Sequence, residues 1–157
     1  MQNWTYRSES RLSNESVIFD IDGVLADASK RQHFLKRSNP DWESFFELCH
    51  EDPLIEESAL LLQIIDPKYT VILMTGRPLN VQAKTISWLE SFSLRWDILI
   101  MRPLGEYSAA MHFKRRDTLL LREKGFEINL AFDDDPRNIE MFRSLKIPSV
   151  YLHSGYY

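Results

Sequence analysis

Two aspartates one residue apart, Asp20 and Asp22, are the residues of this chain best placed to do chemistry. They follow an apolar run that begins at residue 17, and such a run is typical of a strand buried on both faces, which can carry charge only where it leaves the sheet. Two carboxylates this close repel each other unless a cation, or an incoming group that uses the proton, compensates. Oxygen ligands favour a hard ion such as Mg²⁺, which leaves positions open for water and substrate phosphate.

This spacing suits phosphoryl transfer. Asp20 could attack phosphorus to form an aspartyl-phosphate, while Asp22 could protonate the leaving oxygen and later deprotonate the attacking water. Gly23 would then let the backbone turn close to the phosphate. The alternative is a strand that ends in an acidic turn, because Asp-Gly pairs are common in turns. These residues alone leave both interpretations open.

Polar residues that could bind a phosphate occur at two further places. Thr75 follows the apolar residues 71–74, and its hydroxyl and the nearby amides could donate hydrogen bonds to phosphate oxygens. Arg77, after Gly76, could add a guanidinium fork that fits a phosphate, or this segment could be only a turn with a solvated arginine. Lys114 could hold the phosphate and offset the charge of the nucleophile, although a lysine on a helix is usually only solvated.

Three consecutive aspartates, Asp133, Asp134 and Asp135, follow the apolar residues 130–132. They place carboxylates at the end of another buried strand, so at least one of them should complete the magnesium shell. Asp135 stands before Pro136 and could instead cap the next helix. That interpretation leaves Asp133 and Asp134 for the metal.

Strand-like and helix-like segments alternate along the chain, without an internal repeat. The predicted strands begin at residue 17 and cover residues 70–75, 97–101, 128–132 and 149–152. The predicted helices cover residues 54–65, 80–91, 112–124 and 138–145, with two short helices in 29–50 separated at Asn39 and Pro40. The alternation predicts an α/β fold, a mainly parallel five-stranded sheet with helices on both faces. In such sheets ligands bind beyond the carboxyl ends of the strands, where the polar residues lie.

The composition is that of an ordinary globular domain: 157 residues, 44% hydrophobic and 27% charged. A single cysteine, Cys49, excludes an internal disulfide and a zinc site built from several cysteines, so we expect a cytoplasmic location. We find no apolar stretch of the roughly 20 residues that span a membrane, and residues 1–16 are polar and expected to form an N-terminal arm or a short edge element. A net charge of −4 disfavours a protein that coats nucleic acid but not one that binds a strand end.

Taken together, four segments resemble in order and spacing the haloacid dehalogenase (HAD) superfamily of aspartate-nucleophile phosphatases. The segments hold Asp20 with Asp22, Thr75 with Gly76, Lys114, and Asp133 with Asp134. The resemblance covers residues 17–157 and implies a Rossmann-like HAD core. The small helical insertion at about residues 26–53 would then be a minimal cap that leaves the mouth of the site open.

The resemblance also implies a role for each residue. Asp20 would be the nucleophile and Asp22 the general acid and base, with Thr75 and Lys114 on the phosphate. Mg²⁺ would be held by Asp20, the main-chain carbonyl of Asp22, and Asp133.

Within the superfamily, the closest likeness is to the 3′-phosphatase domain of phage-type polynucleotide kinase/phosphatase. The residues that carry it are Gly76 with Arg77, Met101 with Arg102, the pair Asp133 and Asp134, and the ending Ser154-Gly155-Tyr156. This likeness implies that Arg77 contacts the substrate phosphate and that Asp134 is a second carboxylate near the metal. The Gly-x-x-x-x-Gly-Lys-Ser/Thr loop of a kinase half is missing, so a kinase or ligase partner would be separately encoded.

We therefore expect a Mg²⁺-dependent phosphomonoesterase that acts through an aspartyl-phosphate, with a polynucleotide 3′-phosphate as substrate. The alternatives are a small-molecule phosphatase or 5′-nucleotidase, and a non-catalytic scaffold that binds phosphate.

The basic and aromatic residues of the insertion allow two interpretations. Lys30, Arg31, Lys36 and Arg37, with His33 and Phe34 among them, could track a phosphodiester backbone. They could equally form a short amphipathic helix whose apolar side faces the core. We expect Trp42, Phe45 and Phe46 to serve packing rather than base binding.

Overall fold

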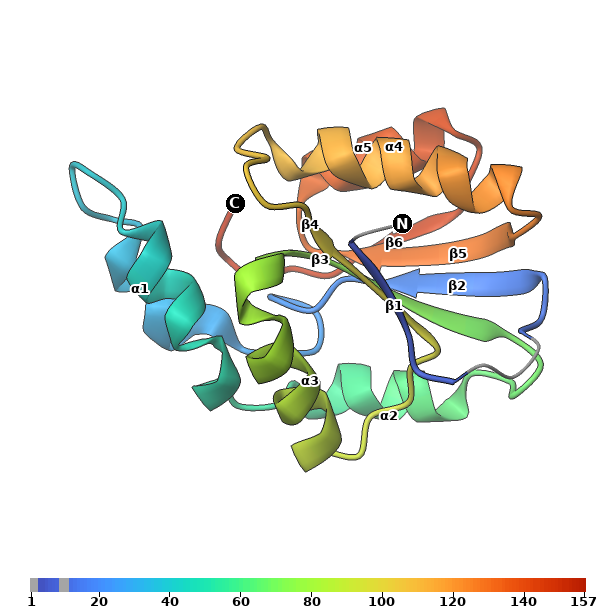
Figure 1. Cartoon of the computed structure of the whole chain (residues 1–157), viewed down its shortest axis with the longest axis horizontal. Coiled ribbons are helices and arrows are strands. Elements are labelled where there is room, and N and C mark those ends of the chain that lie inside the picture. Colours follow the sequence, from blue (N-terminus) through green and yellow to red (C-terminus); the bar gives the residue numbers. More distant parts are fainter. Residues whose placement is uncertain (1–2, 9–11) are drawn as a thin grey trace.

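The computed structural model describes residues 3–8 and 12–157, which fold around one six-stranded sheet (Figure 1). The strands are β1 (Trp4–Tyr6), β2 (Glu15–Phe19), β3 (Thr70–Pro78), β4 (Ile98–Arg102), β5 (Glu127–Asp133) and β6 (Ser149–Tyr151). Their order in the sheet is β1-β4-β3-β2-β5-β6, and all neighbours are parallel except β1 and β4. The predicted α/β fold with a mainly parallel sheet is confirmed, with six strands instead of five.

The additional strand, β1, comes from the segment expected to form an N-terminal arm or a short edge element, and it lies at the edge of the sheet. It pairs antiparallel with β4 and places Trp4 opposite Ile100. Trp4 is buried, and the side chain of Asn3 donates a hydrogen bond to the Met101 carbonyl (3.1 Å). A strand of three residues is too short to show an alternating pattern in the sequence. Residues 1–2 and 9–11 of the expected arm lie outside the described residues.

Helices cover both faces of the sheet, with α4 and α5 on one face and α2 and α3 on the other (Figure 1). The α-helices are α1 (Trp42–Glu47), α2 (Glu56–Ile64), α3 (Gln82–Ser91), α4 (Ala110–Glu123) and α5 (Pro136–Ser144). Three short 3₁₀ helices are η1 (Ala28–Phe34), η2 (Cys49–Glu51) and η3 (Leu79–Val81). Successive residues of β2 pack into opposite cores, Val17 and Phe19 into one and Ile18 into the other. This burial on both faces is why β2 reads as a continuous apolar run.

The expected helical insertion is made of η1, α1 and η2, which project beyond the carboxyl ends of the parallel strands (Figure 1). Its first helix is a 3₁₀ helix, and α1 is capped by Asp41, whose side chain accepts a hydrogen bond from the Ser44 amide (3.0 Å). The insertion therefore lies beside the edge of the sheet at which ligands bind in such folds. In the described part of the chain, no helix has the length and apolar character needed to cross a membrane.

Candidate active site

Three buried carboxylates meet where β2 and β5 end side by side. Asp20 follows β2, Asp133 is the last residue of β5, and oxygens of these two residues and of Asp134 all lie within 4.8 Å of one another. Lys114 reaches the cluster from α4, and its Nζ lies 2.9 Å from Asp20 Oδ2 and 2.7 Å from Asp133 Oδ2. Parallel pairing of β2 with β5 brings the strand ends together, so the three carboxylates lie at one edge of the sheet, and α4 adds Lys114.

Negative charge exceeds positive charge in this cluster. Burial raises the pKa of Asp20 well above its usual value, Lys114 opposes this shift, and repulsion from Asp133 adds to it. Burial likewise raises the pKa of Asp134 to about 7. Asp134 Oδ2 is buried and has no hydrogen-bond partner among the described residues. Three carboxylates facing one ammonium, with a buried oxygen left unpaired, fit a hard divalent cation such as Mg²⁺.

Asp133 and Lys114 are held firmly in place. Asp133 Oδ1 accepts hydrogen bonds from the Asp135 amide and from Asn138 Nδ2, both at 2.9 Å. Burial alone would lower the pKa of Lys114, but Asp133 and Asp20 outweigh it and raise that pKa, so the amine is charged. Asp135 caps α5 by accepting from the Arg137 amide (2.9 Å), which confirms the capping prediction.

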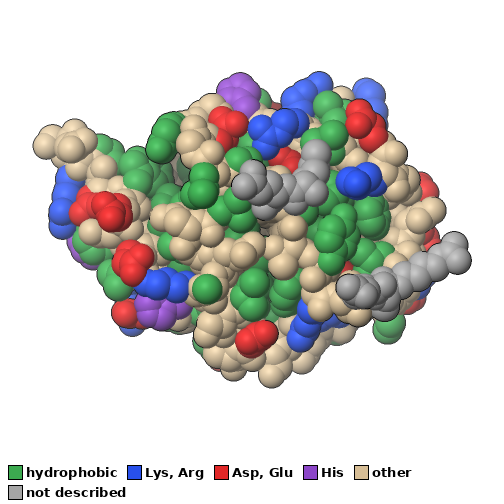
Figure 2. Space-filling view, in the orientation of Figure 1, with side chains coloured by type: hydrophobic (Ala, Val, Ile, Leu, Met, Phe, Trp, Pro, Cys, Tyr) green, Lys and Arg blue, Asp and Glu red, His purple; other side chains and the backbone are tan. Residues whose placement is uncertain are grey.

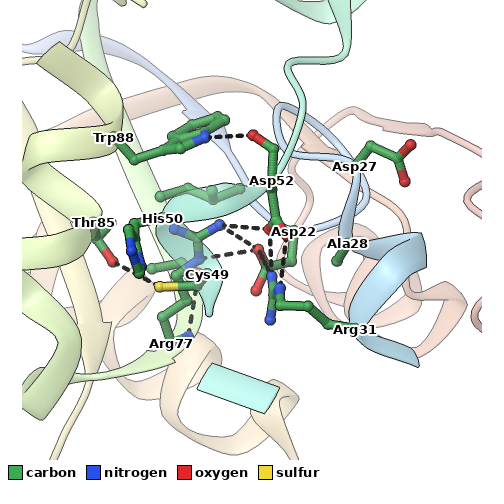
Figure 3. A network of polar contacts seen from close by, with 12 residues as sticks. Asp22, Asp27, Ala28, Arg31, Cys49, His50, Asp52, Arg77, Thr85 and Trp88 are labelled. Carbon is green, nitrogen blue, oxygen red and sulfur yellow. Dashed lines mark hydrogen bonds and ion pairs between the residues drawn. The ribbon is translucent and has the colours of Figure 1, made fainter. Parts of the chain in front are cut away.

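Asp22 lies apart from the carboxylate cluster, in a network of arginines (Figure 3). Its Oδ1 accepts from Arg77 Nε (2.9 Å) and Nη2 (2.6 Å) and from Arg31 Nη2 (3.0 Å). Its Oδ2 has no hydrogen-bond partner in the described ranges, and the residue lines the pocket above the site. Burial acts to raise the pKa of Asp22, but Arg77 and Arg31 outweigh it and hold that pKa below its usual value. Asp22 is therefore an ionised carboxylate with one oxygen fixed and the other open.

Asp52, from the insertion, completes this network. Arg31 binds it through Nε to Oδ1 (2.8 Å) and Nη2 to Oδ2 (2.5 Å), and Arg77 Nη2 lies 3.4 Å from Oδ2. The Asp52 carbonyl also accepts from Trp88 Nε1 (2.8 Å) on α3. Two aspartates thus balance two arginines, and Asp52 ties the insertion to the core.

The sequence did not reveal this network. Arg77 was expected to contact substrate phosphate, but it is 0% exposed and pairs with Asp22, so its contact with substrate stays a prediction. Arg31 was grouped with residues that could track a phosphodiester backbone, yet it is 3% exposed. Asp52 was missed because an aspartate before Pro53 resembles a turn residue. Only the fold of the insertion brings these residues together.

The remaining predicted site residues lie at the ends of β2 and β3. Thr75 is buried, with its Oγ1 accepting a hydrogen bond from the Arg77 amide (3.2 Å), and Gly76 lines the pocket. Gly23 has a positive φ of 80°, and a Cβ there would lie 2.0 Å from Asp134 Oδ2. The backbone at Gly23 thus passes close to a carboxylate of the cluster, while its predicted approach to the phosphate stays a prediction.

A pocket of about 870 Å³ opens above these residues. Asp20, Asp22 and Lys114 belong to its lining, together with residues of the insertion, of the segment 102–110 and of the C-terminal end. Its volume lies within the range of small-molecule sites, so it has room for more of a substrate than a phosphate group.

Comparison with known proteins identifies the family. The model for the polynucleotide kinase PNKP phosphatase domain, a HAD family, matches residues 14–157. The chain belongs to this family. It is therefore a HAD-type phosphatase domain, and the resemblance found in the sequence is confirmed.

Solved structures agree in fold. Two chains from Pnkp1/Rnl/Hen1 RNA repair complexes match with TM-scores of 0.77 and 0.73 at 22% and 23% identity. Each match covers 95% of this chain but 45% and 49% of those chains, so the protein spans about half their length. A haloacid dehalogenase-like hydrolase from Streptococcus pneumoniae matches with a TM-score of 0.54 and 14% identity, over 87% of this chain and 83% of that one. A search of curated proteins found no match.

Proposed function

We propose that this protein is a Mg²⁺-dependent phosphomonoesterase that forms an aspartyl-phosphate on Asp20 and removes 3′-phosphates from polynucleotides. The observation that carries the proposal is the position of Lys114 Nζ, within 2.9 Å of both Asp20 and Asp133 at the base of the pocket. A charged amine beside the proposed nucleophile can offset the negative charge of an arriving phosphate. Membership of the PNKP phosphatase-domain family supports the same chemistry.

Each half of the reaction uses Asp20 and Asp22. In the first half a bond forms from Asp20 to phosphorus, the ester P–O bond breaks, and the leaving oxygen takes a proton from Asp22. In the second half the ionised Asp22 accepts a proton from water, which attacks phosphorus and releases Asp20. The low pKa of Asp22 in this structure suits the second half, and Oδ2 is the oxygen free to take the proton.

Other residues would orient the phosphate. Thr75 and Lys114 would donate hydrogen bonds to its oxygens, and the backbone at Gly23 and Gly76 would pass beside it. Mg²⁺, held by Asp20, the Asp22 carbonyl and the carboxylates Asp133 and Asp134, would supply positive charge against the carboxylates and the phosphate.

The choice of a polynucleotide 3′-phosphate rests on the family and on the relatives. The family is named for the phosphatase domain of a polynucleotide kinase, and two of the solved relatives belong to RNA repair complexes in which Pnkp1 is assembled with Rnl and Hen1. We extend this to a kinase or ligase partner and to a cytoplasmic location for the present chain.

Phosphate release with Mg²⁺ tests the proposal. The substrates are matched 3′-phosphorylated and 5′-phosphorylated oligonucleotides and the corresponding mononucleotides. We expect preference for the 3′-phosphorylated oligonucleotide, and loss of turnover in Asp20→Asn with an unchanged circular dichroism spectrum. Near-full activity of Asp20→Asn would contradict the aspartyl-phosphate mechanism.

A nucleotide or other small phosphomonoester is the second candidate substrate, because acidic residues outnumber basic ones in the pocket lining. Faster hydrolysis of mononucleotides than of oligonucleotides would establish it. Phosphate binding without release from any substrate would instead favour a non-catalytic scaffold.

A further inference from the structure

Three strongly exposed aromatic side chains line the pocket. One of them, Tyr157, is 63% exposed and already faces the Arg137 guanidinium, 5.4 Å from its ring centroid. Of the other two, Trp42, on α1, is 54% exposed, and Tyr107, between β4 and α4, is 94% exposed. Both segments project beyond the carboxyl ends of the strands (Figure 1), and hydrophobic side chains gather on the surface of the insertion at the left of Figure 2. Single exposed aromatic residues need no explanation, but three in the pocket that Asp20 and Lys114 line point to a ligand.

Both rings are carried by ordered parts of the structure. Trp42 stacks on Phe46 (centroids 5.8 Å apart, interplanar angle 23°) and meets the Phe45 ring edge-on. The backbone on either side of Tyr107 is anchored by Arg102, whose Nη1 donates to the carbonyls of Glu106 (3.4 Å) and Ser108 (2.7 Å). The Trp42 ring is thus held by neighbouring rings, whereas at Tyr107 the backbone is held. A ring that is held in place loses little conformational entropy when a flat ligand stacks on it.

The charged residues that line the pocket disfavour binding of a phosphodiester backbone. Its lining holds six carboxylates, Asp20, Asp22, Glu43, Glu47, Glu106 and Asp135, against three cations, Arg102, Lys114 and Arg137. Two of these cations are paired within the lining, Lys114 with Asp20 and Arg137 with Asp135. Three of the carboxylates are paired with cations outside the lining: Asp22 with Arg77, Glu47 with Lys84, and Glu106 with Arg116. The neutral aromatic surfaces are therefore the part of the lining that can attract a polynucleotide end without electrostatic help.

We infer that Trp42 and Tyr107 are stacking surfaces for the nucleobase of the substrate's 3′-terminal nucleotide. For Trp42 this revises the expectation from the sequence that the ring serves packing rather than base binding, because more than half of the residue is exposed. The inference rests on the proposed function and deepens it, because it assigns the affinity for a polynucleotide end to its last base more than to its backbone. We assign the terminal base to these rings because they share one pocket with the residues that would receive the 3′-phosphate. Recognition by stacking also tolerates different bases, because every base offers a flat face.

Steady-state kinetics on two matched oligonucleotides test this inference. One carries a normal 3′-phosphorylated terminal nucleotide, and the other carries a stable abasic analogue at that position. For Tyr107→Ala and for Trp42→Ala we expect KM to rise about tenfold on the normal substrate, with kcat unchanged, and to stay constant on the abasic one. Tyr107→Phe keeps the ring, and Leu60→Ala removes a 59% exposed side chain on α2 outside the pocket, so both should match wild type.

Two results would overturn the inference while leaving the proposed function intact. One is an unchanged KM on the normal substrate for both alanine variants, and the other is a KM of these variants that rises equally on the normal and the abasic oligonucleotide. A steep increase of the wild-type KM between about 50 and about 200 mM salt would also overturn it, since that is the mark of binding through phosphates. Wild-type protein that hydrolyses glycerol phosphate but neither oligonucleotide would refute the proposed function, and the inference with it.

Discussion

Replacing Gly23 with alanine tests whether the loop after β2 must pack directly on the carboxylate cluster. The new Cβ would lie 2.0 Å from Asp134 Oδ2 and 2.5 Å from its Cγ, too close for any non-bonded contact. Asp134 is buried, so its side chain has little room to withdraw. The substitution should therefore displace a carboxylate proposed to lie at the metal.

Gly125, which follows α4, provides a matched control. It has a φ of 90° and nothing within 4 Å of a new Cβ, so Gly125→Ala carries the backbone strain alone. A left-handed conformation costs about 1–2 kcal/mol for a residue with a Cβ, and the stiffer unfolded chain offsets about 0.4–1 kcal/mol of it. We expect Gly125→Ala to lose about 1 kcal/mol of unfolding free energy. Overpacking against Asp134 should add about 1–3 kcal/mol for Gly23→Ala.

Urea unfolding and Mg²⁺-dependent phosphate release measure the two consequences. Gly125→Ala should keep its activity and the rise in melting temperature that Mg²⁺ causes. Gly23→Ala should lose most of both, because the displaced Asp134 can no longer face the metal. If Gly23→Ala matched Gly125→Ala in stability, activity and Mg²⁺ response, the packing of this loop on the cluster would be irrelevant and the reasoning refuted.

Two further predictions concern buried charges. Asp52→Asn removes a carboxylate that balances Arg31 and Arg77. The unfolding free energy measured with urea should therefore fall by about 3–5 kcal/mol, and turnover should fall as well. Wild-type values for both would show that the network is unimportant. With the metal chelated, unfolding free energy should fall as pH rises from about 4 to about 8. Burial raises the pKa of Asp134 to about 7, so the folded state holds this proton more tightly than the unfolded chain and loses that stability as pH passes the folded pKa. Asp134→Asn should reduce this fall, and an equally steep fall in the variant would contradict the assignment.

The carboxylate cluster could be predicted from the sequence because its position depends on a general property of parallel sheets. Asp20, Thr75 and Asp133 each follow an apolar run or stand at its end, and parallel strands carry their last residues to one edge. Local patterns therefore sufficed to predict that these side chains converge. The family resemblance added the proposed roles, which spacing alone could not assign.

The arginine network could not be predicted, because it depends on how the insertion folds back on the core. Arg31 and Asp52 are 21 residues apart, and no periodic pattern links an arginine in a 3₁₀ helix to an aspartate in a loop. Both look like surface residues in the sequence, since arginine and aspartate are seldom fully buried unless paired. Their burial is set by tertiary contacts, Arg31 over the Phe45 ring and Asp52 against Trp88.

The two aspartates from which the sequence analysis began end in opposite electrostatic environments. Asp20 faces Asp133 and Asp134 with one lysine between them, and its pKa is raised. Asp22 points to two arginines, and its pKa is lowered. A pair of titratable groups with diverging pKa values is what a division between nucleophile and proton-transfer group requires. Because protein charges alone favour the ionised form of Asp22, this structure matches the second half of the proposed reaction, in which Asp22 accepts a proton from water. For the first half Asp22 must carry a proton, so its protonation is the step that the arginine pairing of this residue opposes.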